Sequence, residues 1–495
     1  MDKEIVTAAR NRVSNQLGEK LANKASDEFC VAFGLPAPTL AGLEAITEIA
    51  RPRSIVLEMV RQPELSAGLN QIVDELRNTE VWSQFRTMLN RLELPALTSG
   101  VTTELMEPGT SEPALLPVSS ARLLRYVKVV SLRDNFLKVS SAITDQLEKS
   151  ARGSFHAELE TVAAVAQPRT SITQTCWLNR TIRSFANPQI LTEVAADDSI
   201  ERIDLTRRLE PEIDVGGITV GAPQFREKFN LTGKGIIVAV IDSEVALNHP
   251  ALKGRVAHKQ NFTDEPWGNS DLHGTAVAGI IASNDANFGG MAPEATIYNY
   301  KVLATNRTLT GDDFDGAIAI QQALEDGVHV ANCSWGAGAA SDGTSREAVA
   351  CDEAWALGLT IIKSAGNKGP GAGTLTTPAD AEGVIVVGAT DRQGHAVQNY
   401  SSRGPAGSKT RPHLVAPGGI FQGTGITSCL VGGGFGDCGP GTSFAAPHVS
   451  GLVALLLEQD PSLRPDDLRT FLLQRCTPLP GIDKNIQGAG LVSLA

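Results

Sequence analysis

Short, continuously apolar runs characterise the chain after residue 222. Five of them, GIIVAVID, TIYNYKVL, HVANCSWG, LTIIKSAGN and GVIVVGAT, are rich in β-branched residues, and helical patterns such as GDDFDGAIAIQQALEDG lie between them. Apolar positions that do not alternate with polar ones are typical of strands buried on both faces, and intervening helices indicate a parallel sheet. We therefore predict an α/β domain over residues 222–495. Its chemistry is expected at the carboxyl ends of the strands, where Asp242 and Asn367 stand.

The earlier part of the chain has a different pattern. Apolar residues recur every four positions from Ile5 to Leu21, and similar patterns follow, which predicts a helical domain of unknown role at 1–95. Residues 96–119 are rich in Thr, Ser, Pro and Gly, as a linker is. Strand-like and helical runs over 120–213 predict a small α+β domain. The helical domain is either a bundle without chemistry or an adaptor that recruits a partner.

Composition narrows the class of protein. The hydrophobic fraction of 42% supports a large core, and the formal charge of -12 disfavours nucleic acid or an anionic membrane as a partner. The N-terminus lacks the apolar core of a secretory signal, and no run approaches the roughly 18 apolar residues of a membrane helix. The cysteines are scattered, although Cys429 and Cys438 share one loop and could pair. We expect a cytoplasmic protein with free thiols and neither a nucleic-acid nor a membrane partner.

Three polar residues stand at the borders of apolar elements. Asp242 ends the run VAVID, His273 precedes Gly-Thr and an apolar helix, and Ser443 precedes the run AAPHVSGLVALLL. Each alone has a structural explanation as a turn former, a helix cap or a loop residue. Together they have a chemical one, because a serine hydroxyl becomes a good nucleophile when an imidazole, held by a carboxylate, takes its proton.

The stretch GPGTSFAAPHVSG suits such a nucleophile. Gly439 and Gly441 keep the approach to Ser443 free of side chains. A serine at a helix start lies among unpaired N–H groups that favour developing negative charge. Pro447 costs little here, because the N–H that it lacks would have bound the carbonyl of Ser443.

The three motifs, in the order Asp, His, Ser, resemble those of the subtilisin-like serine proteases (subtilases). The segments GMAPEATIYNYKVL, NCSWG, SAGN, TPAD, YSSRGP and RPHLVAPGG agree with the same family, and the resemblance covers residues 222–495. It implies a subtilisin-like parallel sheet flanked by helices, and an endopeptidase that acts on protein or peptide substrates through an acyl-enzyme. It also implies site roles: Asp242, His273 and Ser443 as the triad, Asn367 in the oxyanion hole, and Ser334, Trp335, Gly336, Ala365 and Gly366 in substrate binding.

The chain departs from the family pattern at several positions. Glu244 stands where the family usually has glycine, and we expect it to disturb the turn or the field around Asp242; Leu272 and Ala276 also differ. Trp335 is large for its position, so it either narrows the upstream substrate pocket or packs in the core. No acidic residue is clearly placed around SAGN to bind a basic side chain, which favours a neutral or apolar P1 residue.

We expect no required cofactor and no metal in the site. The family often carries structural calcium, but no ligand set can be assigned in this sequence. The acidic stretch 311–316 is expected to cap and solvate the start of a helix.

The segment before the protease-like domain has a resemblance of its own. The stretch CWLNRTIRSFANPQILTEVAADDSIERIDLTRRLEPE is similar to the second half of the subtilase propeptide, a ferredoxin-like α+β domain. This implies an intramolecular inhibitor and a zymogen that cleaves itself between about 206 and 222. Two alternatives remain: the domain is retained as a regulatory lid, or the chain is a pseudoprotease that binds peptides without cutting them.

Overall fold

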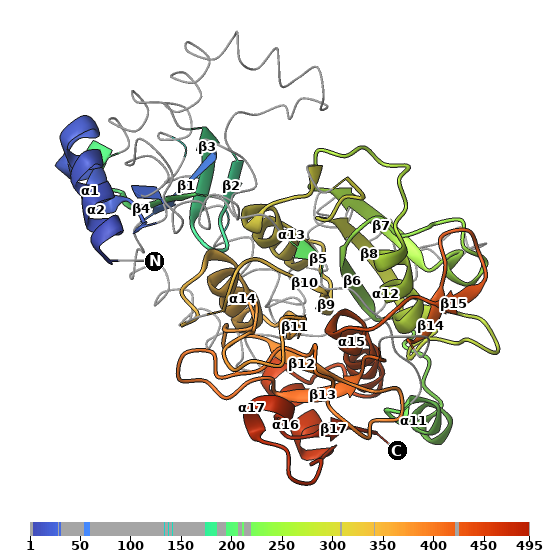
Figure 1. Ribbon diagram of the computed structural model, residues 1–495. Helices are drawn as coiled ribbons and strands as arrows, with labels where there is room; N and C mark the ends of the chain where they lie inside the picture. The colour runs from blue at the N-terminus through green and yellow to red at the C-terminus, as the bar shows by residue number, and fades with distance from the viewer. Residues whose placement is uncertain are drawn as a thin grey trace, which may run out of the picture.

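The computed structural model has a large sheet between helices and a smaller sheet beside it (Figure 1). It describes residues 3–27, 29–30, 54–59, 133, 137, 141, 174–185, 195–205, 210–211, 219–306, 309–340, 342–420 and 425–494.

The large sheet has nine strands in the order β16-β17-β13-β12-β11-β9-β6-β8-β7. All neighbours are parallel except β16 and β17. Strands β7 and β8 lie on one side of β6 and the later strands on the other, so β6 stands at a topological switch point, where α/β sheets bind ligands. The bounds are β6 Ile237–Asp242, β7 Val256–Asn261, β8 Thr296–Lys301, β9 Val330–Cys333, β11 Thr360–Ser364, β12 Ile385–Thr390, β13 Leu414–Pro417, β16 Cys476–Thr477 and β17 Leu491–Val492.

Both faces of this sheet are covered, as its continuous apolar runs predict. Val238 and Val240 of β6 belong to the core under helices α12 (Leu272–Ala282) and α15 (Thr442–Gln459). Ala239 and Ile241, which point the other way, belong to the core under α13 (Asp313–Glu325) and α14 (Arg346–Ala356). The predicted α/β architecture is therefore confirmed.

The other described elements from residue 210 onward are short and lie around the large sheet (Figure 1). They are β5 Glu210–Pro211, α11 Ala222–Phe229, the 3-10 helix η1 Pro250–Leu252, β10 Trp335–Gly336, β14 Thr427–Cys429, β15 Phe435–Asp437, α16 Pro465–Gln474 and α17 Lys484–Gln487.

The small sheet corrects one expectation about the N-terminal part. Helices α1 (Lys3–Leu17) and α2 (Glu19–Lys24) agree with the helical pattern. However, β1 (Ser54–Met59), inside the segment expected to be helical, is an inner strand of the order β2-β3-β1-β4. Its antiparallel neighbours β3 (Thr181–Phe185) and β4 (Ile200–Leu205) come from the segment 120–213.

A strand whose partners lie this far along the chain cannot be assigned from local periodicity. Helix α2 is joined to the same sheet, because Ser26 N donates to Ile203 O at 2.8 Å. Residues 96–119, the expected linker, lie outside the described residues, as does most of 120–173.

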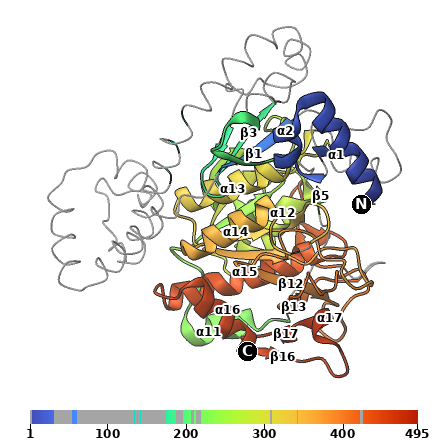
Figure 2. The same ribbon diagram turned by 90° about the vertical axis from the view of Figure 1, so that its left-hand side faces the viewer.

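The small sheet packs against α13 of the large domain (Figure 2). Trp177 and Leu178, which follow β2 (Gln174–Cys176), belong to the same apolar core as α13. Leu178 N also donates to Gln321 Oε1 at 3.2 Å. The interface is therefore apolar in part and hydrogen-bonded in part.

The acidic stretch 311–316 begins α13. Asp312 caps the helix by accepting hydrogen bonds from the N–H groups of Phe314 and Asp315, each at 3.1 Å, which confirms the expected cap. The expected solvation is wrong, because the side chains of Asp312 and Asp315 are only 0% and 2% exposed. Arg183 of the small sheet covers them and lies 2.9 Å from Asp312 Oδ1 and 3.0 Å from Asp315 Oδ1.

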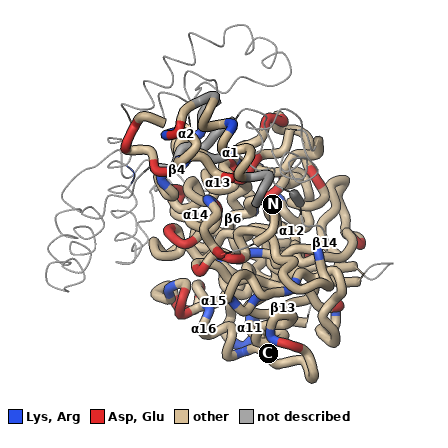
Figure 3. The backbone as a smooth tube through the Cα atoms, turned by 60° about the vertical axis from the view of Figure 1, so that its left-hand side comes forward, with Lys and Arg blue, Asp and Glu red and all other residues tan. Residues whose placement is uncertain are grey.

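Acidic and basic positions are interspersed along the described backbone (Figure 3). The seven cysteines are thiols, so Cys429 and Cys438 form no disulfide, and burial raises the pKa of Cys429 to about 12. Among the described residues, no helix combines the length and apolarity needed to cross a membrane.

Candidate active site

The carboxylate that ends β6 binds the imidazole that begins α12. His273 Nδ1 and Asp242 Oδ1 are 2.6 Å apart, and the two side chains are 6% and 0% exposed. Asp242 Oδ1 also accepts a hydrogen bond from Ser243 N at 2.6 Å. A carboxylate in this place keeps the imidazole proton on Nδ1 and leaves Nε2 as the acceptor.

Helix α12 begins in close contact with the end of β6. A Cβ on Gly274 would lie 2.5 Å from Ser243 O, so only glycine fits. Gly274 N donates to Ser243 Oγ at 2.9 Å, and that hydroxyl donates to Asp271 Oδ1 at 3.2 Å. Asp271 in turn caps the helix by accepting from His273 N at 2.7 Å. The backbone of His273 is thus fixed relative to β6.

Ser443 lies in the first turn of α15, beside His273. The ring centroids of His273 and Phe444 are 5.2 Å apart, which brings the imidazole next to this turn. Ser443 is fully buried, and its Oγ donates to Ser334 O at 3.4 Å. Asp242 and His273 are therefore in contact at the carboxyl end of β6, and the residue that follows Ser443 packs beside the imidazole.

Pro447 leaves the carbonyl of Ser443 without its usual helical donor, as the sequence implies. Ser334 Oγ takes that role and donates to Ser443 O at 2.5 Å. The same hydroxyl accepts from Asn332 Nδ2 at 2.9 Å. Ser334, expected only to bind substrate, therefore also supports the first turn of α15.

Asn367 is held by the residue before Ser443. Its Oδ1 accepts from Thr442 N at 2.9 Å and from Thr442 Oγ1 at 3.1 Å. This orients the amide, because the oxygen faces the helix N-terminus and Nδ2 is the half that can donate. Sequence reasoning missed Thr442; the available signal was a second hydroxyl at the start of the same helix.

Backbone groups of Ala365 and Gly366 form hydrogen bonds with other residues of the protein. Ala365 N donates to Val387 O at 2.9 Å, and Ala365 O accepts from Thr376 N at 3.3 Å. Gly366 N donates to Thr442 Oγ1 at 3.1 Å. These two residues can therefore shape a substrate pocket, but their described hydrogen bonds are internal.

The expected substrate edge carries a segment of the chain itself. Strand β10 pairs antiparallel with β5, with Trp335 opposite Pro211 and Gly336 opposite Glu210. The Trp335 side chain is fully buried and packs on α13, where a Cβ on Gly316 would come within 2.7 Å of its ring. This geometry agrees with the core-packing interpretation of Trp335.

The three departures from the expected motif are accommodated. Leu272 is 38% exposed, and Ala276 is fully buried. Glu244 is buried, but its carboxylate lies 3.2 Å from the ammonium of Lys301 and accepts hydrogen bonds from residues 268–270. The Glu244 carboxylate, which we expected to disturb the turn, is therefore paired and hydrogen-bonded by neighbouring residues. Within the described ranges, no three His, Cys, Asp or Glu side chains gather as a metal site would require.

The chain is similar to proteins of known activity. It is 33% identical to "Serine protease AprX" of Bacillus subtilis (strain 168) over 327 residues, which cover 60% of this chain and 73% of that protein. It is also 33% identical to "Major intracellular serine protease" of the same organism over 304 residues, with 57% and 88% covered.

Among solved structures, fervidolysin from Fervidobacterium pennivorans, a keratinolytic enzyme related to subtilisin, matches with a TM-score of 0.55. The match covers 68% of this chain and 58% of the fervidolysin chain. Because the sequence identity is 23%, the match supports the fold alone. The model of the "Subtilase family" matches residues 233–490, more than half of the chain. The chain therefore belongs to the subtilase family and is a subtilisin-like serine endopeptidase.

Proposed function

We propose that Asp242, His273 and Ser443 form the catalytic triad of this endopeptidase. Ser443 attacks the peptide carbonyl, His273 takes the hydroxyl proton and returns it to the leaving amine, and Asp242 orients the imidazole. The observation that carries the proposal is the buried 2.6 Å contact between His273 Nδ1 and Asp242 Oδ1 beside the first turn of α15. Ser443 Oγ needs a side-chain rotation from Ser334 O toward Nε2, as serine hydroxyls in substrate-free sites often do.

The oxyanion of the tetrahedral intermediate is stabilised by Asn367 Nδ2 and by the N–H of Ser443. The orientation of the Asn367 amide supports this role, because Thr442 binds its oxygen at 2.9 Å. Such donors act at the moment when charge develops, in a site that excludes water.

The chain is made as a self-inhibited zymogen. Pairing of β5 with β10 supports this, because an extended segment on the edge strand occupies it as a substrate would. Cleavage is expected between about 206 and 222; residues 206–209 and 212–218 lie outside the described residues. A bond between Pro211 and Val220 fits best, because Pro211 pairs with β10, whereas Val220 O accepts from Leu494 N in the large domain at 2.9 Å.

The enzyme acts inside the cell on proteins or peptides with a neutral or apolar P1 residue. One support is its similarity to a protein named as a major intracellular serine protease. The proposed chemistry uses only side chains and a backbone N–H of the protein and needs no cofactor; a calcium site is not assigned. The helices at the N-terminus remain candidates for binding a partner.

Ser443→Ala tests the triad and the zymogen together. We expect peptidase turnover to fall by about 10⁶-fold, as in subtilisin when the nucleophile is removed. A fluorophosphonate probe should label the wild type and not the variant, because only an activated serine reacts. Mass spectrometry should find two fragments for the wild type and one intact chain for the variant.

Each result has a counterpart that contradicts the proposal. An unlabelled, inactive wild type would identify a pseudoprotease. A labelled wild type that stays intact would retain the triad and reject self-cleavage, leaving the small domain as a permanent lid.

A further inference from the structure

A fully buried lysine lies between two buried glutamates beside the end of β6. Lys301 ends β8 and pairs in register with Asp242. Its Nζ is 2.8 Å from Glu265 Oε2 and 3.2 Å from Glu244 Oε2, and the two carboxylate side chains are 3% and 7% exposed. Buried charges are costly unless they are paired, so each member depends on the others. We name Glu244, Lys301 and Glu265 the glutamate–lysine cluster.

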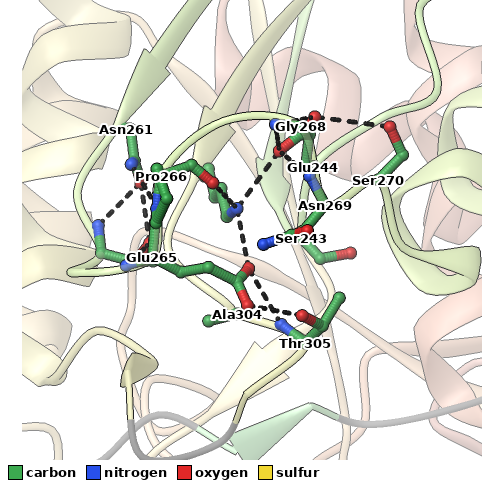
Figure 4. Close-up of polar contacts among 12 residues, drawn as sticks. Ser243, Glu244, Asn261, Glu265, Pro266, Gly268, Asn269, Ser270, Ala304 and Thr305 are labelled. Carbon is green, nitrogen blue, oxygen red and sulfur yellow. Dashed lines mark hydrogen bonds and ion pairs between the residues drawn. The ribbon is translucent and has the colours of Figure 1, made fainter. Parts of the chain in front are cut away.

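Glu244 connects the end of β6 to the segment that precedes α12. Both of its carboxylate oxygens lie 3.0 Å from Gly268 N, and Oε2 accepts from Asn269 N at 3.2 Å. Its backbone carbonyl accepts from Asp271 N at 2.9 Å. Figure 4 shows Glu244 facing this segment, which leads directly to His273.

Glu265 holds the other end of that segment. Its carboxylate accepts from the N–H groups of Thr305 at 3.2 Å and Asn306 at 3.1 Å, and Lys301 Nζ donates to Pro266 O at 3.2 Å. Burial opposes ionisation of Glu265, but hydrogen bonds from Lys301 and Thr305 outweigh it, and the pKa of Glu265 lies below its usual value. Glu265 is therefore a carboxylate at neutral pH, as the pairing with Lys301 requires.

We propose that the glutamate–lysine cluster positions His273 for proton transfer, an inference that rests on the triad proposed above. The direction of the imidazole depends on where α12 begins, and Asp271 is the N-cap of α12. The cluster holds residues 265–271 at both ends, so it fixes that starting point relative to Asp242. Glu244 thus replaces the glycine of the family pattern with a side chain that acts through His273, as a positioning residue.

The experiment compares Glu244→Gly, Glu244→Gln and Lys301→Met with the wild type on one peptide substrate. Turnover is expressed per active site, counted by fluorophosphonate titration, so that losses from misfolding are removed. We expect Glu244→Gly and Lys301→Met to lower kcat by about ten- to a hundredfold, because a small misplacement of a catalytic group has effects of this size. KM should change less than about twofold, since the three side chains of the cluster are buried and bonded to one another.

Glu244→Gln provides the rescue. Its amide oxygen can still accept from Gly268 N and Asn269 N, so kcat should recover to within about threefold of the wild type. The matched control is Lys409→Met, which removes another lysine that is paired with a glutamate, Glu382, at 3.2 Å and lies outside the site. Its kcat per titrated site should equal that of the wild type.

The outcomes separate this inference from the triad. If the wild type shows no Ser443-dependent turnover, the triad itself fails. If the wild type is active and Glu244→Gly retains wild-type kcat per titrated site, the positioning role is overturned, even where Lys301→Met does not fold. A fall in thermal stability with unchanged kcat would likewise identify a structural role alone and reject positioning.

Discussion

Single buried polar side chains hold the turns on which the site stands. Asn299 of β8 is fully buried, and its Nδ2 donates to Ser243 O at 3.1 Å while its Oδ1 accepts from Val245 N at 3.0 Å. It thereby braces the turn that follows Asp242. An asparagine inside the apolar run TIYNYKVL indicates a satisfied buried amide. Its partners could not be predicted from the sequence, because they belong to the turn after the neighbouring strand β6.

A second single residue, His413, predicts that the free energy of unfolding depends on pH. Burial, together with Arg411 and Arg469, holds the pKa of His413 well below its usual value of 6.5. Its Nδ1 accepts from Val386 N at 2.9 Å, which requires the neutral ring. Below about pH 6.5 the unfolded chain therefore takes up a proton that the folded chain does not, and the free energy of unfolding falls by about 1.4 kcal/mol per pH unit.

His413→Asn should remove this slope, because Asn Oδ1 can accept the same hydrogen bond without titrating. The measurement is the urea midpoint between about pH 7 and pH 5, in the Ser443→Ala background to prevent self-digestion. Equal slopes in the two proteins would show that His413 does not account for the acid sensitivity.

At the scale of elements, α15 shows how a helix can start with a candidate nucleophile and still be buried. Its residues from Thr442 to Leu457 are buried, and Pro447 interrupts its hydrogen bonds one turn after Ser443. The sequence predicts the helix and the freed carbonyl. It could not predict the replacement donor, Ser334, which lies on a loop after β9.

This exchange of donors predicts a coupling between two substitutions. Ser334→Ala should lower the free energy of unfolding by about 1–3 kcal/mol, because Ser443 O is then buried without a donor. Pro447→Ala restores an N–H at the position that normally binds this carbonyl, so the loss from Ser334→Ala should be smaller in that background. Denaturant unfolding of the four inactive Ser443→Ala proteins measures the cycle; strictly additive effects would contradict it.

At the scale of the whole molecule, the N-terminal part and the protease domain meet through buried charge. Arg183 lies over the ring of Phe314 at 4.8 Å and contacts Asp312 and Asp315 at the start of α13. The negative side chains suit a helix N-terminus, and the arginine balances them while the two parts are in contact. Separation would return these three charged groups to water.

Arg183→Met should therefore weaken the self-inhibition proposed above. Removing one partner of a buried ion pair costs about 3–5 kcal/mol, which here destabilises only the associated form. The lag before peptidase activity appears in freshly refolded protein should shorten, and the N-terminal fragment should be degraded sooner. Arg464→Met, which breaks an ion pair with side chains 68% and 46% exposed, is the control and should keep the wild-type lag. An unchanged lag for Arg183→Met would argue against a role of this contact in inhibition.

The amino-acid sequence by itself predicted the alternating strands and helices of the protease domain, and it named the candidate catalytic residues. The local pattern of apolar residues predicts β6 and α15. The motifs around Asp242, His273 and Ser443 are each a short uninterrupted stretch of sequence, so each can be recognised without the fold. Only the tertiary structure decided which distant groups meet. The placement of β1 in the small sheet, the occupation of β10 by β5 and the pairing of Glu244 with Lys301 all depend on contacts between residues far apart in sequence, and local patterns carry no information on such partners.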